Sequence, residues 1–138
     1  MIFEVFLFSF FTIAVIAPLV SIVFLPIGIF TVAKTNTILR TNYQNKMMLL
    51  VALAVTIQCG FRLASAYVPM TEIQWTMLNG FQTLALILVN TLAARASSRR
   101  LSSLGRKKYW AMLHGPPFAG LVLGTYLALT IKETKPSA

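Results

Sequence analysis

Arg62 is the residue whose chemistry most needs an explanation, because it interrupts an apolar run of membrane-spanning length. The run extends from Met47 to about Tyr67 and contains no other charge. An arginine inside such a helix costs about 2.5 to 3.5 kcal/mol on insertion scales, so it requires a compensating role. It lies six residues before Val68, about 9 Å from the outer end of its helix. Two interpretations remain open. The side chain reaches the headgroups or a structural partner, or it binds an anionic group.

Several polar residues lie at about the same predicted depth in the membrane as Arg62. Gln58, Arg62 and Ser65 are spaced i, i+4, i+7 and therefore lie on one face of a helix. Asn79 and Gln82 share a face of the next apolar run. Helices joined by a short turn are antiparallel neighbours, so these side chains can meet where lipid offers no water. We predict a ligand-binding site at Gln58, Arg62, Asn79 and Gln82; hydrogen bonding between helices explains the pattern equally well.

The sequence has three carboxylates: Glu4, Glu72 and Glu133. Glu72 and Glu4 both fall on the predicted outer side, so either is a candidate counter-ion for Arg62. A carboxylate beside a guanidinium stays ionised, which favours binding over acid catalysis. We therefore add Glu72 to the predicted ligand-binding residues and assign no catalytic residue.

Cysteine and histidine each occur once. Cys59 alone excludes an intramolecular disulfide and a Cys-x-x-Cys redox relay. His114 alone cannot supply two axial ligands to a haem or build a metal site without carboxylates. We expect no metal and no cofactor.

The composition predicts an all-α integral membrane bundle. Of the 138 residues, 57% are hydrophobic and 11% are charged, whereas soluble domains carry about 25% charged residues. A single membrane domain, 1–138, of about four transmembrane helices fits this length. The predicted spans are about 5–33, 47–67, 73–94 and 109–131, and the predicted basic loops are 34–46 and 95–108.

The first apolar run is longer than a bilayer requires. Pro18 and Pro26 can kink it, because each removes a backbone donor. A cleaved signal peptide is the alternative. We favour a retained span, because the N-terminus lacks a positive region and the run is too long for a signal peptide.

Basic residues alternate across the predicted spans. The loop 34–46 has three, the loop 95–108 has six, the outer turn has none and the tail has two. The positive-inside rule then places both basic loops in the cytoplasm and both termini on the extracytoplasmic or lumenal side. The net charge of +9 is thus a topology signal, and we expect no nucleic-acid partner. Anionic lipid is the expected partner of 95–108.

Gly120 and Gly124 form a Gly-x-x-x-Gly pattern in the fourth run. Glycines at this spacing let helix backbones approach closely. We expect helix packing within the bundle here, with dimerisation as the alternative.

Three segments together resemble part of a fungal seven-helix membrane family, the lipid-translocating-exporter-like proteins and their uncharacterised relatives. The segments are NYQNK at 42–46, CGFRLASAYVP at 59–69 and LILVNTLAAR at 86–95. The exporter-like group has a glutamate three residues after its arginine, where this chain has Ser65. The resemblance covers about half of the chain. It implies a truncated or divergent member that handles lipids or other hydrophobic compounds.

These observations favour a small multi-pass membrane protein that binds or transports a lipid or another hydrophobic small molecule. The first alternative is a structural or assembly subunit of a membrane complex, with membrane-protein partners. The second is an integral membrane enzyme such as a terpene cyclase or a prenyl-chain transferase. Enzymes of this kind need acids or metals in the membrane, and the predicted spans hold no carboxylate.

Overall fold

The computed structural model describes residues 2–31 and 37–131, and these residues form helices and no strands. The all-α class predicted from the sequence is therefore confirmed for the described part of the chain. The elements, in order, are α1 (Ile2–Phe11), the π-helical segment η1 (Thr12–Ile16), α2 (Ala17–Ser21), α3 (Leu25–Phe30), α4 (Arg40–Tyr67), α5 (Glu72–Ser103), the 3-10 helix η2 (Lys108–His114) and α6 (Ala119–Leu129).

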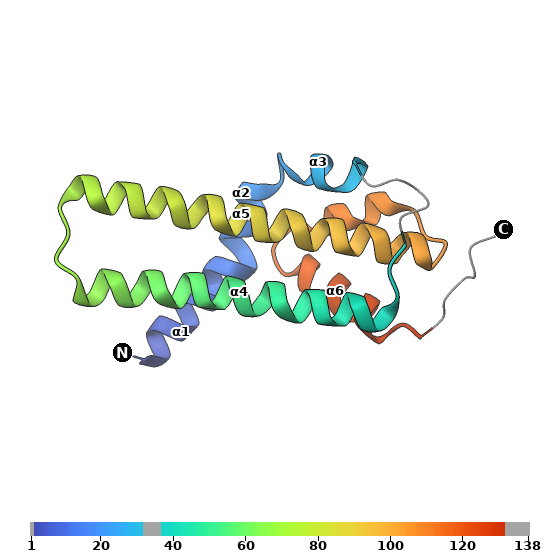
Figure 1. Ribbon diagram of the computed structural model, residues 1–138, viewed down its shortest axis with the longest axis horizontal. Coiled ribbons are helices and arrows are strands. Elements are labelled where there is room, and N and C mark those ends of the chain that lie inside the picture. Colours follow the sequence, from blue (N-terminus) through green and yellow to red (C-terminus); the bar gives the residue numbers. More distant parts are fainter. Residues whose placement is uncertain (1, 32–36, 132–138) are drawn as a thin grey trace.

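The antiparallel hairpin of α4 and α5 sets the long axis of the molecule (Figure 1). The two helices have 28 and 32 residues, about 42 and 48 Å at 1.5 Å per residue. Each is long and apolar enough to cross a membrane. Only 17% and 22% of their most apolar stretches are buried within the chain. A core helix of a soluble protein would be mostly buried, so this exposure favours a lipid environment.

The turn between the two long helices follows from its local sequence. Val68 is extended and precedes Pro69, which disfavours helix in the residue before it. Thr71 then caps α5 in a capping box. The Gln74 N–H donates to the Thr71 hydroxyl, and the Thr71 N–H donates to Gln74 Oε1 at 3.0 Å.

The N-terminal run crosses the hairpin as a bent helix. α1, η1 and α2 follow one another without a break, and the chain turns at residues 22–24 before α3 begins. Pro18 lies in the first turn of α2, two residues after the end of η1. Its ring excludes an ordinary α-helical bond there, and a wider π turn accommodates it. α1 contacts α4, whereas α2 and α3 contact α5 (Figure 1).

The segment 95–108 is not the exposed loop that its charges predict, because α5 continues through it to Ser103. Ser97, Ser98 and Arg100 are fully buried. Small side chains allow close packing here, and the Arg100 guanidinium finds backbone carbonyls to bond. The loop 34–46 is also shorter than predicted: residues 32–36 lie outside the described part, and α4 already begins at Arg40.

The fourth apolar run does not form one spanning helix. It divides into η2 and α6, and α6 has 11 residues, about 16 Å of helix against a hydrocarbon core of about 30 Å. The start of α4 and the end of α5 lie together and carry Arg40, Arg99 and Arg100, so we call this the basic end of the hairpin. The C-terminal end of α6 lies at this end (Figure 1). Arg40 Nε and Gln44 Nε2 of α4 donate to the Ala128 carbonyl at 2.9 and 2.8 Å, and Arg100 Nη2 of α5 donates to the Thr130 carbonyl at 2.7 Å.

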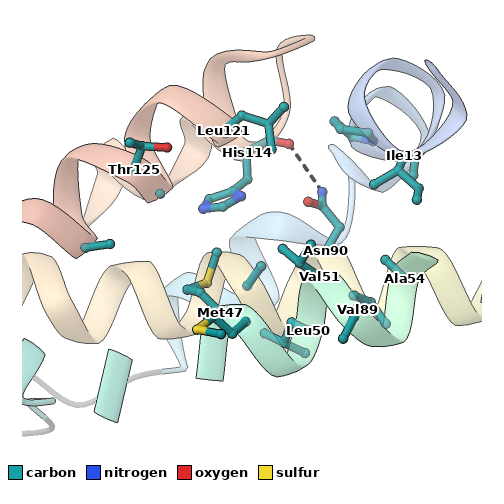
Figure 2. A pocket seen from close by; sticks show the side chains of 18 of the residues that line it. Ile13, Met47, Leu50, Val51, Ala54, Val89, Asn90, His114, Leu121 and Thr125 are labelled. Atoms are coloured by element: carbon teal, nitrogen blue, oxygen red, sulfur yellow. Dashed lines mark hydrogen bonds between the residues drawn. The ribbon is translucent and has the colours of Figure 1, made fainter. Parts of the chain in front are cut away.

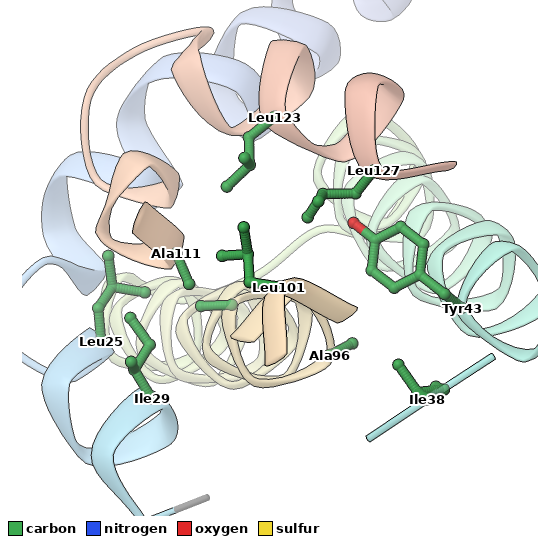
Figure 3. Close-up of a cluster of buried hydrophobic side chains, with 10 residues drawn as sticks. Leu25, Ile29, Ile38, Tyr43, Ala96, Leu101, Ala111, Leu123 and Leu127 are labelled. Atoms are coloured by element: carbon green, nitrogen blue, oxygen red, sulfur yellow. The ribbon is translucent and has the colours of Figure 1, made fainter. Parts of the chain in front are cut away.

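The main apolar core also lies at this basic end. Figure 3 shows side chains of α3, α5, η2 and α6 meeting around Leu101. Its buried members are Leu25, Ile29, Ile38, Tyr43, Ala94, Ala96, Leu101, Ala111, Leu123 and Leu127. A smaller cluster of Ala17, Ala54, Leu86 and Val89 joins α2 to the middle of the hairpin. In the outer half of the hairpin α1 contacts α4, where Phe8 lies against Arg62.

Candidate functional site

The predicted polar cluster surrounds a small cavity of about 190 Å³ in the outer half of the hairpin. Gln58 and Arg62 of α4 line it together with Asn79 and Gln82 of α5. Gln82 Nε2 donates to Gln58 Oε1, which ties the two helices together. Side chains of α1 and η1 close the cavity, including Phe8.

Arg62 stacks on an aromatic ring and has no oxygen acceptor among the described residues. Its guanidinium carbon lies 3.9 Å from the centroid of the Phe8 ring, within the range of a cation–π contact. Its Nε is buried and has no hydrogen-bond partner. Ser65 shares its helix face, but the Ser65 hydroxyl donates to the Arg62 backbone carbonyl at 2.8 Å. The charged group therefore lies at the cavity with its hydrogen-bonding capacity largely unused.

Glu72 does not join this cluster. It is exposed in the first turn of α5 and does not line the cavity. Within residues 2–31 and 37–131, no ion pair links it to Arg62. An acidic residue in a first turn stabilises the positive end of its own helix, which accounts for Glu72 locally. Glu4 lies on α1, four residues before Phe8, and is exposed.

A much larger groove of about 810 Å³ lies between α4 and α6 and extends to η1 and α2. Figure 2 shows Met47, Leu50 and Val51 of α4 across from Leu121 and Thr125 of α6. Apolar side chains dominate the lining. Its polar members are Gln44, Asn45, Asn90, His114 and Thr125. The sequence could not reveal this groove, because it exists only when α6 folds back along the hairpin.

A hydrogen-bond network lies beside the groove, and two of its members, Asn90 and His114, line the groove. Ser97 Oγ lies 2.8 Å from His114 Nε2 and 3.0 Å from the Tyr43 hydroxyl. Asn90 Nδ2 donates to the Ser21 hydroxyl and to the His114 carbonyl, the latter at 3.2 Å (Figure 2). The network therefore connects α2, α4, α5 and η2.

The Ser97–His114 pair has the separation of a nucleophile and its base. Ser97 is fully buried, however, and Tyr43 shares its hydroxyl. A substrate would have no access to that oxygen. The pair acts instead as hydrogen bonding between helices, which satisfies polar groups where water is excluded.

Gly120 and Gly124 face other elements of the same chain. A Cβ at Gly120 would lie 2.9 Å from His114 Nδ1 and 3.1 Å from the His114 Cα. A Cβ at Gly124 would lie 3.5 Å from the Met47 methyl group and 3.8 Å from the Tyr43 hydroxyl oxygen. Gly120 therefore allows α6 to pack tightly against η2, and Gly124 faces α4.

The small cavity and the large groove adjoin. Ala17 of α2 and Leu86 of α5 line both of them. The π-helical segment η1 also contributes to both, with Thr12 and Ile16 at the cavity and Ile13 at the groove. π-Helical turns are frequent at functional sites. A small cavity lined by an arginine therefore lies beside a larger groove whose walls are mainly apolar.

Within the described part of the chain, no three His, Cys, Asp or Glu side chains group closely enough to hold a metal ion. Comparison of the chain with family models, curated proteins and solved structures finds no match in any of the three.

Proposed function

We propose that this chain is a small multi-pass membrane protein that binds or transports a lipid or another hydrophobic small molecule. The groove of about 810 Å³ carries this proposal. Ligand pockets typically enclose about 300 to 1,000 Å³, with apolar walls and a few polar groups that orient the ligand. The groove has this size and composition. The resemblance to lipid-translocating-exporter-like proteins points to the same class of ligand.

We further propose a topology in which α4, α5 and the bent N-terminal run cross the membrane. Of the twelve lysines and arginines, only Arg62 lies away from the loops 34–46 and 95–108 and the C-terminal tail. The positive-inside rule assigns that basic end to the cytoplasm and the 68–71 turn to the other side. The bonds from Arg40 and Arg100 to the end of α6 support a cytoplasmic position for this end too. On this proposal η2 and α6 form a re-entrant hairpin rather than a fourth span.

The ligand proposal is tested by filling the groove. Val51 lines the groove, whereas Val55, one turn later on the same helix, lines neither space. Both are exposed, so each position should accept a larger side chain. Val51→Trp should weaken the binding of a fluorescent lipid analogue to the purified protein at least tenfold, and Val55→Trp should leave it unchanged. Equal binding by both variants and the wild type would refute the proposal.

Native mass spectrometry of the gently purified protein tests the same proposal independently. A co-purifying lipid or metabolite that is lost in Val51→Trp supports it. A stoichiometric protein partner with no small molecule would favour the role of a complex subunit.

A further inference from the structure

We propose that the cavity at Arg62 binds an anionic oxygen group, a carboxylate or a phosphate. This inference rests on the proposed function and specifies its ligand class: a single-chain amphiphile with an acidic head. The head would lie at Arg62, and the chain would extend into the groove.

Two buried hydrogen-bond donors without partners belong to residues that line the same small cavity. Gln58 is fully buried, and its Nε2 has no hydrogen-bond partner. The bond from Gln82 Nε2 occupies Gln58 Oε1, so the unused atom of this amide is a donor. Arg62 Nε is the second buried donor without a partner. Buried donors are almost always satisfied, so two exceptions at one cavity point to a missing acceptor.

The positive charge of Arg62 at the cavity also favours an anionic ligand. Arg62 has no ion pair within the described part of the chain, and its contact with Phe8 supplies no oxygen acceptor. A guanidinium is a planar fork of N–H donors that suits carboxylate and phosphate oxygens. In the low dielectric of a membrane interior, an anion would compensate this charge strongly. An anionic oxygen group satisfies both donors and the charge together.

The cavity lies next to the apolar groove. Ala17 and Leu86 line both spaces, so the cavity and the groove adjoin where α2 packs against α5. The cavity and the groove beside it therefore suit a ligand with one acidic end and one apolar chain.

The test compares two radiolabelled probes that differ in one group, palmitic acid and methyl palmitate. They are added to the purified protein in a neutral detergent at a pH where the acid is ionised. We expect the acid to bind about tenfold more tightly or better, the factor typical of one hydrogen bond to a charged group. Arg62→Gln should remove this preference and Gln58→Met should reduce it, and both should leave ester binding unchanged.

Matched variants distinguish the anionic site at Arg62 from lipid binding in the groove. Arg95→Gln removes the same charge at an exposed position of α5 and should leave both probes unaffected. Val51→Trp should weaken both probes, because it blocks the groove that they share. Size-exclusion profiles check that Arg62→Gln folds, and Gln58→Met removes a cavity donor while Arg62 is retained.

Each outcome decides the question. If the acid and the ester bind equally, or if Arg62→Gln weakens both alike, the anionic site is refuted while lipid binding stands. If neither probe binds, the proposed function fails, and radiolabelled inorganic phosphate then decides the anionic site. Phosphate binding that disappears in Arg62→Gln supports a site for a free anion, and no phosphate binding refutes the site.

Discussion

Replacing Arg100 with methionine should loosen the attachment of α6 to the hairpin. Arg100 is fully buried and donates to three backbone carbonyls. Nη2 donates to Thr130 at 2.7 Å, Nε to Leu127 at 3.4 Å and Nη1 to Ile38 at 3.5 Å. Methionine fills similar space with an adaptable apolar chain but donates nothing. The substitution therefore removes the hydrogen bonds and the charge while largely preserving the packing.

The expected cost follows from these distances. A hydrogen bond to a charged group contributes about 1.5 to 3 kcal/mol. Only the bond to Thr130 is short; the bonds to Leu127 and Ile38 lie near the limit of hydrogen-bond distances and contribute little. Removing a buried charge also recovers part of its desolvation penalty. The free energy of unfolding should therefore fall by about 2 kcal/mol.

The assay is unfolding in mixed micelles by titration with a denaturing detergent. Trp110 lies in η2, so its fluorescence in a Trp75→Phe background follows this end of the molecule. Hydrogen exchange should also become faster in α6 than in α4. Arg99→Met is the matched control, because it removes the same charge from the adjacent residue, whose Nε has no acceptor. Equal stability of Arg100→Met and Arg99→Met would refute this account of α6.

Two further predictions concern packing and topology. Gly120→Ala should lower the free energy of unfolding by about 1 to 3 kcal/mol, because its Cβ would lie 2.9 Å from His114 Nδ1. Gly80→Ala, with nothing within 4 Å, should instead raise it by up to about 1 kcal/mol; equal effects in the same unfolding titration would contradict the close contact. In a background without the native cysteine, Ile131→Cys and Val68→Cys should react with a membrane-impermeant maleimide from opposite sides of sealed vesicles. Labelling from the same side would show that the fourth run crosses the membrane after all.

The hairpin was predictable because its signals are local. Pro69 ends one helix, and the polar spacing on each side brings Gln58 and Gln82 to similar depths. Their hydrogen bond follows from the antiparallel geometry alone. The ligand that we propose for this cluster stays a prediction.

The basic end was not predictable from the same rules. The segment 95–108 has the charge of a solvated loop, but Arg100 is buried because α6 presents its carbonyls to it. That arrangement depends on the chain reversing after His114, and Phe118 adopts a left-handed conformation, with φ of 60°, just before α6 begins. Neither periodicity nor charge signals such a reversal, so the sequence could predict neither the groove nor the burial of Arg100.

The bonds at the end of α6 also impose an order on biogenesis. The donors that hold this end in the described part of the chain, from Arg40, Gln44 and Arg100, precede α6. During synthesis these donors emerge before the carbonyls that they later bind. On the proposed topology the hairpin of α4 and α5 can therefore insert first, and α6 packs against it afterwards. Until then the groove lacks its α6 wall, so on the proposed function a ligand is enclosed only after synthesis has reached residue 130.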